Sequence, residues 1–376
     1  MKIIIFSEPG NAGVKRHVLD ILGRLGGGEF EFILVYSLRR ADRVYADEIA
    51  NLRSLGVTTY EVNVTSSPEL WNDLKAAFQF MKIVKSEKPD LIHCHSSKAG
   101  FIGRVFGKIA SWKTPILFTP NVLISFVQPK YNIFERICAP FTTAMISSCE
   151  SDEIDFQSLP YLNNVPSHVV PLCVDTIYTK KARSRSIAKD SEKKTILIGA
   201  CGRIARQKQS LLFFKVATLM EHSHPHLRFQ WIGDYSESDP ESQDVKAFLA
   251  ANPLSNVEIT GWVDDASEYI RNLDVLLMLS RYESFGYVTA DALAMGIPVI
   301  GTAVTGTRDL IENGVNGYLV PPKPHNVSSA LDQLLEKPDR YNQISKSART
   351  SMSQNFDISV MCESLSKVYR SYASKR

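Results

Sequence analysis

RYESFGYVTADALAMGIPVIG, residues 281–301, runs from the end of an apolar stretch through a Glu-Ser-Phe-Gly turn into a pattern of small residues typical of a buried helix. If Glu283 lies on the loop and Gly286 begins the helix, Asp291 falls within the second helical turn. Both carboxylates can then face one ligand that lies across the helix N-terminus. Helix termini bind phosphate and carboxylates accept hydrogen bonds from hydroxyls, so the stretch favours a phosphorylated, hydroxyl-rich ligand.

Apolar, β-rich runs alternate with helical patterns along the whole chain. In the first half the runs are residues 3–7, 32–36, 91–94, 116–119, 144–148 and 169–174. In the second half they are residues 195–201, 228–233, 257–260, 275–279, 298–301 and 317–320. This alternation predicts an α/β protein with parallel sheets and helices on both faces. Because 376 residues are too many for one ordinary core, we expect two doubly wound, Rossmann-like domains.

One basic segment interrupts the pattern. Residues 180–194, KKARSRSIAKDSEKK, carry seven Lys or Arg and two acidic residues. We therefore predict a first domain over 1–178, a linker over 179–194, a second domain over 195–354 and a helix over 355–376 that could pack back on the first domain. We expect the linker to be solvated, although its charge would also suit anionic lipid.

Composition excludes several classes of protein. Hydrophobic residues make up 44% of the chain and charged residues 22%, which is typical of a soluble globular protein. A net charge of +3 gives no reason to expect a nucleic-acid partner. Six scattered cysteines without a C-x-x-C pair favour a reducing cytoplasm and disfavour structural zinc. The N-terminal MKIIIFSEPG predicts a buried strand rather than a signal peptide, and no run reaches the roughly 18 apolar residues of a membrane span.

Three other loops follow expected strands. The first, residues 8–14 (EPGNAGV), offers Gly10 and Gly13 for close approach of the backbone to a ligand at a helix start. It lacks the G-x-G-x-x-G pattern, and no acidic residue clearly ends the second strand, so a dinucleotide oxidoreductase is disfavoured. A purely structural turn remains an equal alternative.

The second loop, residues 93–100 (HCHSSKAG), leads into another helix. We expect His93 and His95 to point to opposite faces of the strand, which would exclude a two-histidine metal site and place one of them in the core. The Ser-Ser-Lys run at residues 96–98 could bind a polar or anionic acceptor, or could only cap the helix.

The third loop, residues 201–208 (CGRIARQK), follows the strand that begins the second domain. Gly202 at the strand end allows Arg203 to turn toward a ligand, and Lys208 comes from the far side of the loop. Two cations that flank a pyrophosphate would neutralise it as a leaving group. We therefore favour diphosphate binding over a solvated basic turn.

Glu283 and Asp291 have two further interpretations. Paired carboxylates act as acid and base in glycoside hydrolysis, but they must then lie on opposite sides of the scissile bond. These two share a loop and helix beside expected phosphate donors, so binding of ligand hydroxyls is the better hypothesis. A structural interpretation also remains, with Asp291 solvated on the helix and Glu283 as a cap.

Together these motifs resemble those of the retaining glycosyltransferases of family 4 (GT4), and the resemblance covers nearly the whole chain. It implies the GT-B fold, in which two Rossmann-like domains face each other across a cleft. The matching motifs, in that family's order and spacing, are Gly202-Arg203 with Lys208, Gly261-Trp262-Val263, Glu283-Ser284-Phe285-Gly286 with Asp291, GIPVI at 296–300 and NGVNGYLV at 313–320. Each motif is weak alone, but the set is specific.

The resemblance implies a role for each matching residue. Four residues are expected to act in the reaction. Arg203 and Lys208 would clamp the donor diphosphate, Glu283 would bind the sugar, and Asn121 would follow the fourth strand. In the donor site, the base is expected near Trp262 and the ribose on Asp291. The residues expected to bind the donor are Gly13, Gly202, Trp262, Val263, Ser284, Phe285, Gly286 and Asp291. Residues expected on the acceptor side are His95, Ser96, Ser97 and Lys98. Basic residues and a helix dipole would replace a metal, so no metal or cofactor is expected.

Two positions depart from the family's pattern. Asp291 stands where the family's E-x7-E motif has a second Glu, so its shorter side chain must approach the ligand more closely or act through water. Asn121 ends the run Phe-Thr-Pro-Asn where many bacterial relatives have Thr-Pro-His, and an amide cannot titrate. The chain could therefore be weakened as a catalyst or depend on a partner.

The resemblance implies transfer of a hexose, with retention, from a nucleotide-sugar, first of all a UDP-sugar, to a saccharide acceptor on polyprenyl diphosphate in surface polysaccharide synthesis. The expected place is the cytoplasm, peripheral to the inner membrane face. Aromatic residues that could line a lipid-facing surface or belong to the core are Phe126, Tyr131, Phe134 and Phe141. The alternatives are a sugar-nucleotide 2-epimerase and a catalytically weak binding subunit of a transferase complex.

Overall fold

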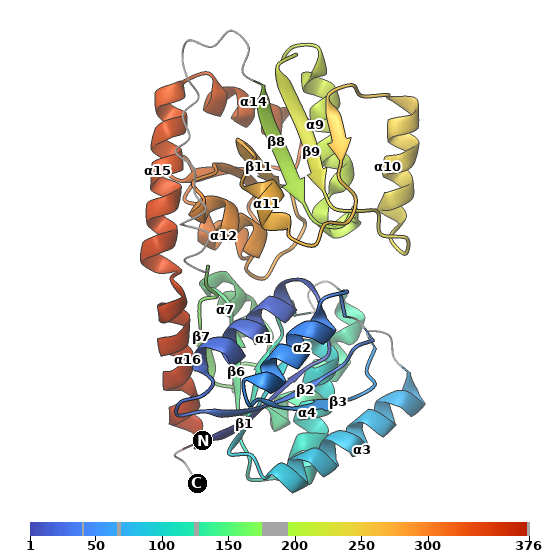
Figure 1. The fold of residues 1–376 in the computed structure, drawn as a ribbon, viewed down its shortest axis with the longest axis vertical. Coiled ribbons are helices and arrows are strands. Elements are labelled where there is room, and N and C mark those ends of the chain that lie inside the picture. Colours follow the sequence, from blue (N-terminus) through green and yellow to red (C-terminus); the bar gives the residue numbers. More distant parts are fainter. Residues whose placement is uncertain (40, 66–68, 124–127, 175–194, 374–376) are drawn as a thin grey trace. The chain divides into compact units, whose positions relative to one another are not determined.

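The computed structural model describes residues 1–39, 41–65, 69–123, 128–174 and 195–373. The chain forms two compact units, Met1–Leu172 with Ser359–Arg376, and Cys173–Ile358. Each unit contains one parallel sheet with helices packed on it (Figure 1). The two predicted doubly wound α/β domains are therefore confirmed. The predicted linker, residues 179–194, lies outside the described residues.

The first unit is built on a seven-stranded sheet with the strand order β3-β2-β1-β4-β5-β6-β7, and all neighbouring strands are parallel. The strands are β1 (Lys2–Ser7), β2 (Glu31–Tyr36), β3 (Thr58–Glu61), β4 (Leu91–His95), β5 (Ile116–Thr119), β6 (Ala144–Ser147) and β7 (Ser167–Val169). The strand order reverses between β1 and β4. Sheets of this kind bind ligands outside the carboxyl ends of their strands at such a reversal.

The second unit repeats this plan with six parallel strands in the order β10-β9-β8-β11-β12-β13. The strands are β8 (Ile196–Cys201), β9 (Leu227–Ile232), β10 (Val257–Ile259), β11 (Val275–Met278), β12 (Val299–Thr302) and β13 (Gly317–Val320). Here the reversal falls between β8 and β11, so the loops after these two strands are the expected ligand-binding loops.

Helices connect the strands in both units. Those of the first unit are α1 (Ala12–Leu25), α2 (Tyr45–Ser54), α3 (Leu70–Glu87), α4 (Ser97–Ala110), α6 (Asn132–Cys138), α7 (Glu150–Gln157) and, from Ser359 on, α16 (Ile358–Ala373). Those of the second unit are α9 (Ser210–Glu221), α10 (Pro240–Ala251), α11 (Ala266–Ile270), α12 (Tyr287–Ala294), α13 (Thr307–Leu310), α14 (Pro324–Leu335) and α15 (Pro338–Asn355). Short 3-10 turns are η1 (Pro129–Tyr131), η2 (Ala139–Phe141) and η3 (Arg206–Lys208). Among the helices in the described ranges, none has the length and apolar character needed to span a bilayer.

Each unit has its own aromatic core. In the first, Phe6 of β1 stacks on Phe80 of α3 with ring centroids 4.6 Å apart. In the second, Trp231 of β9 lies against Phe213 and Phe214 of α9 at 5.3 and 5.8 Å. The central strands are buried on both faces, so their sequences are almost continuously apolar.

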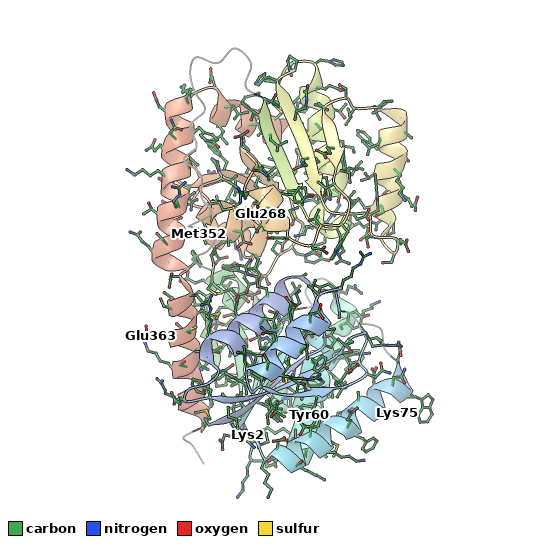
Figure 2. The ribbon with its side chains drawn as sticks, in the orientation of Figure 1. Lys2, Tyr60, Lys75, Glu268, Met352 and Glu363 are labelled. Atoms are coloured by element: carbon green, nitrogen blue, oxygen red, sulfur yellow. The ribbon has the colours of Figure 1, made fainter. Side chains whose placement is uncertain are left out.

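Strand β3 was not predicted from the sequence, because its four residues TTYE are half-buried or exposed and show no apolar run. It lies at the edge of the sheet. Its Tyr60 hydroxyl donates to Glu87 at the end of α3 (2.5 Å), and the same carboxylate accepts from Lys2 at 3.3 Å. Tyr60 and Lys2 are labelled in Figure 2. These polar contacts add to the backbone pairing of β3 with β2 and to the packing of partly buried Tyr60 against the core.

Helix α16 joins the first unit although it is last in sequence. Its Tyr369 is fully buried, and the hydroxyl contacts His93 Nδ1 of β4 at 2.8 Å. Arg370 pairs with Glu29 at 2.7 Å. The boundary between the units falls after Leu172, earlier than the predicted end at residue 178.

Tyr369→Phe should weaken the first unit, because His93 Nδ1 would be left buried without this partner. We expect the free energy of unfolding to fall by about 1–3 kcal/mol, measured by urea denaturation of the full chain. Tyr269→Phe, at an exposed position on α11, is the matched control. Equal stability of the two variants would contradict the importance of this contact.

Candidate active site

The loops after β8 and β11 meet at the strand reversal of the second unit. Residues 202–209 follow β8, and residues 279–286 follow β11. Because β8 and β11 are neighbouring parallel strands, both loops leave the sheet at the same edge. The sequence motifs with Arg203 and Glu283 are therefore on adjacent loops, although they are far apart in the chain.

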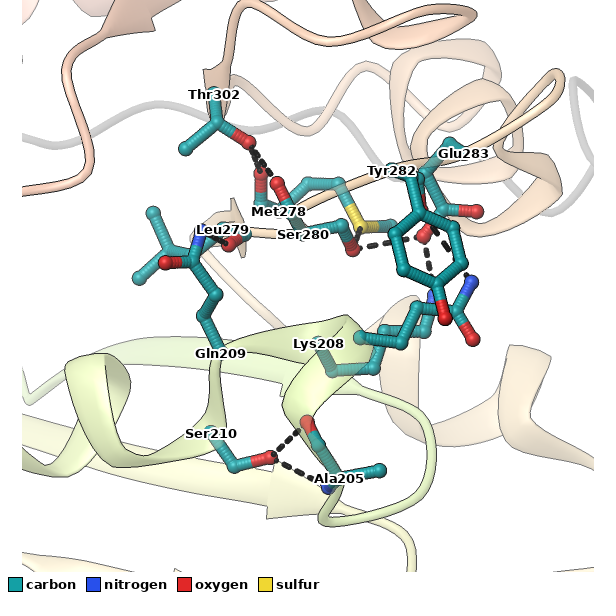
Figure 3. A network of polar contacts seen from close by, with 11 residues as sticks. Ala205, Lys208, Gln209, Ser210, Met278, Leu279, Ser280, Tyr282, Glu283 and Thr302 are labelled. Carbon is teal, nitrogen blue, oxygen red and sulfur yellow. Dashed lines mark hydrogen bonds and ion pairs between the residues drawn. The ribbon is translucent and has the colours of Figure 1, made fainter. Parts of the chain in front are cut away.

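An ion pair joins the two loops. Lys208 Nζ lies 2.6 Å from Glu283 Oε1, and both side chains are less than one-fifth exposed. The same carboxylate oxygen accepts a hydrogen bond from Ser280 Oγ at 2.7 Å (Figure 3). An ion pair shielded from water in this way is stronger than one on the open surface. The two residues expected to contact diphosphate and sugar thus hold each other in place.

Two glutamines that the sequence analysis missed reinforce this connection. Gln207 Nε2 donates to the carbonyl of Tyr282 at 3.3 Å, and Gln209 Nε2 donates to that of Leu279 at 2.6 Å. The backbone N–H of Arg281 donates in turn to the carbonyl of Gln207 at 2.8 Å. The sequence signal that could have identified them is the run Gln-Lys-Gln at a helix start, three polar side chains in succession.

Gly202 is required where it stands. Its φ of 137° is disfavoured for residues with a side chain, and an added Cβ would lie 2.9 Å from Lys208 Cε. Its carbonyl accepts a hydrogen bond from Trp231 Nε1 at 2.8 Å, which fixes the turn on the core. Arg203 follows directly, and its side chain is exposed. The loop therefore presents one exposed cation and one paired cation.

The turn before α12 brings backbone rather than side chains to the site. Phe285 is buried, with its ring 5.5 Å from that of Tyr287, so only its main chain can face a ligand. Gly286 has a φ of 88° and precedes α12, where no side chain caps the helix N-terminus. A Cβ at Gly306 would lie 2.4 Å from the carbonyl oxygen of Ser284, so the loop after β12 closely supports this turn.

Asp291 lies on α12 with 6% of its surface exposed, so the interpretation of this residue as a solvated helix position was wrong. It interacts with Cys201 at the end of β8. Burial raises the pKa of the Cys201 thiol to about 11, Lys208 opposes that shift, and Asp291 adds to it. The second acidic residue of the motif is therefore near the same strand end as Lys208.

Trp262 and Val263 follow β10, at the edge of the second sheet. Gly261 before them has a φ of 71°. Trp262 is exposed, and its Nε1 donates to Asp264 at 3.3 Å. An exposed aromatic ring with adjacent main chain suits the base-contacting role expected for this segment.

A buried polar cluster occupies the strand reversal of the first unit. Ser96 Oγ donates to Glu8 after β1, and both residues are less than one-tenth exposed. Asn121 after β5 contacts His17 Nδ1 through Oδ1 at 3.3 Å, and its Nδ2 donates to the Thr119 carbonyl at 3.3 Å. The sequence analysis missed His17 and Glu8.

Ser96 and Asn121 have φ angles of 70° and 62°, a region that residues other than glycine rarely adopt. Such conformations cost about 1–3 kcal/mol and concentrate at functional sites. Both residues lie at strand ends: Ser96, expected on the acceptor side, is the N-cap of α4, and Asn121, expected to act in the reaction, follows β5. The backbone geometry therefore marks this cluster as the candidate site of the first unit.

The prediction that His93 and His95 face opposite sides of the strand was wrong. Residues two apart in a strand share a face, and the two rings lie 4.1 Å apart. His95 also packs edge-on against His17 at 5.0 Å, and both His93 and His95 are fully buried. His93 Nε2 contacts the Thr119 hydroxyl at 2.8 Å. Both histidines, rather than one, therefore belong to the interior.

The remaining residues expected in the first unit lie at helix starts. Gly13 is in the first turn of α1, and Ser97 is the first residue of α4. Lys98 Nζ pairs with Asp73 of α3 at 2.7 Å, so a ligand of Lys98 would compete with this ion pair. Within the residues that the structure describes, no group of three or more His, Cys, Asp or Glu is arranged to hold a metal ion.

Comparisons with known proteins identify the class to which this architecture belongs. A model of glycosyltransferase family 4 matches residues 11–177, and one of glycosyl transferases group 1 matches residues 195–337. An N-acetyl-alpha-D-glucosaminyl L-malate synthase of Bacillus anthracis is 32% identical over 340 residues, 88% of this chain and 86% of that protein. The chain therefore belongs to glycosyltransferase family 4, and the resemblance noted in the sequence is confirmed.

Two further proteins extend the comparison. The UDP-Gal:alpha-D-GlcNAc-diphosphoundecaprenol alpha-1,3-galactosyltransferase of Escherichia coli is 23% identical over 372 residues, 95% of this chain and 93% of that protein. The solved structure of Anabaena HepE, in complex with UDP and glucose, matches with a TM-score of 0.80 at 16% identity, covering 99% of this chain and 100% of that one. The likeness to such structures shows that the chain has the GT-B fold.

The buried histidines predict that the first unit is sensitive to acid. Burial lowers the pKa of His17 from 6.5 to about 4 and holds the pKa values of His93 and His95 well below the usual range. Because these folded-state pKa values lie below those of the unfolded chain, the unfolded chain binds more protons as the pH falls from 6.5 to 4. Stability should therefore decrease through that window.

His17→Gln should remove its own share of this pH dependence, about 3 kcal/mol over the full window. Urea denaturation at a series of pH values between 6.5 and 4 measures the slope for the wild type and the variant. His226→Gln, at an exposed position, is the control. If His17→Gln leaves the slope unchanged, His17 is not the buried neutral group described.

Proposed function

We propose that the chain is a retaining, metal-independent hexosyltransferase that moves a sugar from a UDP-sugar to a saccharide on polyprenyl diphosphate, in surface polysaccharide synthesis. The observation that carries the proposal is the pairing of Lys208 with Glu283 beside exposed Arg203, at the strand reversal of the second unit. Membership of glycosyltransferase family 4 supports it. The choice of UDP rests on the Escherichia coli relative, named for UDP-Gal, and on the UDP bound to the Anabaena protein.

The proposed donor site neutralises a diphosphate with protein groups alone. Arg203 and Lys208 would supply two positive charges, and the uncapped N-terminus of α12 would supply backbone N–H donors. Diphosphate binding would draw Lys208 away from Glu283, whose carboxylate could then accept hydrogen bonds from sugar hydroxyls. The ligand-free ion pair would in this way hold both groups near their working positions.

In the proposed reaction, the acceptor hydroxyl attacks the anomeric carbon from the face that the diphosphate leaves. A bond forms between the acceptor oxygen and the anomeric carbon, and the bond from that carbon to the diphosphate oxygen breaks. The hydroxyl proton passes to the departing phosphate oxygen, so the products are the glycoside and UDP. Negative charge grows on the diphosphate during this step, where Arg203 and Lys208 would stabilise it.

The proposed acceptor side is the polar cluster of the first unit, where Ser96 would contact the acceptor and fully buried His95 would lie behind it. Asn121 keeps the role in the reaction that the sequence implies. The lipid-linked nature of the acceptor rests on the name of the Escherichia coli relative, which acts on a diphosphoundecaprenol substrate. With an acceptor of that kind, the enzyme would act in the cytoplasm, at the inner face of the membrane.

Donor binding can be tested before the acceptor is known. A panel of UDP-, GDP- and ADP-sugars should include one, a UDP-sugar, that raises the melting temperature of the full chain, because a ligand of the folded state stabilises it by about 2.7 kcal/mol at 100 times its Kd. Absence of a shift with every member of the panel would refute the donor site. Conversion of the free donor to its 2-epimer without an acceptor would establish the epimerase instead.

Arg203→Ala should lower kcat for transfer by roughly 100-fold or more, because it removes one donor of charge stabilisation to the leaving group. Its side chain is exposed, so the melting temperature of the unliganded protein should be unchanged. Arg206→Ala, exposed on the same loop, is the matched control and should retain activity. Equal rates in the two variants would reject the role of Arg203.

Asn121 allows the binding-subunit alternative to be tested. As an active transferase, the wild-type chain should release UDP in the presence of a lipid-linked acceptor, and Asn121→Ala should lower that rate while the UDP-sugar still raises the melting temperature. Asn121→His is accessible because His tolerates the left-handed backbone better than most residues. If the wild type releases no UDP and the Asn121→His variant does, the result would favour the binding-subunit alternative.

A further inference from the structure

The outer face of α3 combines aromatic and basic side chains. Trp71 and Phe78 are 76% and 59% exposed, unusual values for such large apolar groups. Lys75, Lys82 and Lys85 are exposed on the same helix. The five positions follow the spacing i, i+4, i+7, i+11 and i+14, so they form one stripe along the side of α3 that faces away from the core. Figure 2 shows Lys75 on this helix, at the periphery of the first unit.

The same chemistry continues onto the neighbouring helices. Helix α3 packs along α4, and α4 packs against α6. The end of α4 and the residues after it carry exposed Ile109 and Trp112, and α6 carries exposed Ile133, Phe134 and Ile137. Exposed cations accompany them at Lys113, Lys130 and Arg136. We call the exposed residues of 71–85, 109–113 and 130–137 the α3–α4–α6 face.

The acidic side chains of these helices are paired or buried, so they leave no free negative charge on the face. Asp73 pairs with Lys98 at 2.7 Å, and Glu87 accepts hydrogen bonds from Lys2 and Tyr60. Glu135 is buried against Arg104 at 2.8 Å. Residues 70–87, 108–113 and 129–141 contain no other acids, so all of their exposed charges are positive.

We propose that the α3–α4–α6 face is a docking surface for an anionic lipid bilayer. Trp and Phe side chains partition into the headgroup region of a bilayer, and Lys side chains place their charges at its surface. An interfacial helix with both features binds anionic membranes through apolar burial and electrostatic attraction together. The stripe on α3 meets this description over four helical turns.

A second copy of the chain fits the face poorly. In a symmetric interface, the lysines of α3 would face the same lysines of the second copy. Like charges would then be brought close together and removed from water. Protein interfaces are also depleted of Lys at their centres, whereas here Lys75 lies between Trp71 and Phe78. An anionic bilayer accommodates the rings and the cations at once.

The aromatic residues that the sequence suggested for a lipid-facing surface or the core differ in their exposure in the structure. Phe134 is exposed and belongs to the α3–α4–α6 face, while Tyr131 and Phe141 are half-buried. Phe126 lies outside the described residues. The residues that carry most of the face, Trp71 and Phe78, were not among those suggested.

The proposed docking surface rests on the proposed function and deepens it, since an acceptor on polyprenyl diphosphate lies at a membrane. The test of the surface needs neither the sugar donor nor the acceptor. The full chain is mixed with vesicles of phosphatidylcholine alone or with about one third phosphatidylglycerol, and bound protein is measured by flotation at low and high salt. We expect binding to the anionic vesicles, weakened by salt.

Two sets of variants locate the surface. The triple variant Lys75→Glu, Lys82→Glu, Lys85→Glu should lower the partition coefficient on anionic vesicles by roughly 100-fold or more. The control triple, with the same charge change on the second unit, is Lys215→Glu, Lys323→Glu, Lys346→Glu, all exposed. The double variant Trp71→Ala, Phe78→Ala should lower the partition coefficient by roughly tenfold. Its control is the double variant Leu55→Ala, Leu219→Ala, which removes two exposed leucines outside the face.

Three results would overturn the proposal: no binding of the wild type to anionic vesicles, equal binding to neutral ones, or equal loss in the α3 and control triples. A wild type that self-associates through Trp71 and Phe78 without binding vesicles would make the face an interface between copies. Circular dichroism checks the fold of each variant. Vesicle binding without stabilisation by any nucleotide-sugar would refute the proposed function alone, and the reverse result would refute the docking surface alone.

Discussion

The ion pair between Lys208 and Glu283 depends on a property of parallel sheets: neighbouring strands end at the same edge. Strands β8 and β11 are adjacent, so the loops that follow them meet although the two charged residues are 75 positions apart. Gln207 and Gln209 then fasten one loop to the carbonyls of the other. The cationic and the acidic motif are therefore joined by direct contacts, and these contacts depend on the strand order of the second sheet.

The corresponding edge of the first sheet is built with different electrostatics. Its polar groups are buried and mostly neutral, with three histidines whose pKa values are lowered by desolvation. Such groups can orient hydroxyls through hydrogen bonds but add little net charge. One unit of this glycosyltransferase thus concentrates charge where a diphosphate is proposed to bind, and the other concentrates hydrogen-bonding groups where an uncharged hydroxyl is proposed to lie.

Sequence patterns predicted the two sheets because buried parallel strands are almost continuously apolar. Strand β3 was not predicted because its sequence TTYE shows no apolar run, and only the fold reveals its pairing with β2. The charged motif residues were found because glycine and charge follow strand ends, whereas Gln209 and His17 were missed because their partners lie 70 and 104 residues away. Only the fold reveals those partners, and the same holds for the burial of Asp291.

The return of α16 to the first unit also sets the order in which that unit can be completed during synthesis. His93 and Tyr369 are separated by 276 residues, and at about 5–20 residues per second a ribosome needs roughly 14–55 s to span that distance. The second unit is translated in the meantime. During that time β4 is already synthesised, but the ring of His93 lacks its Tyr369 partner, and the first unit can be completed only when the last helix of the chain has been translated.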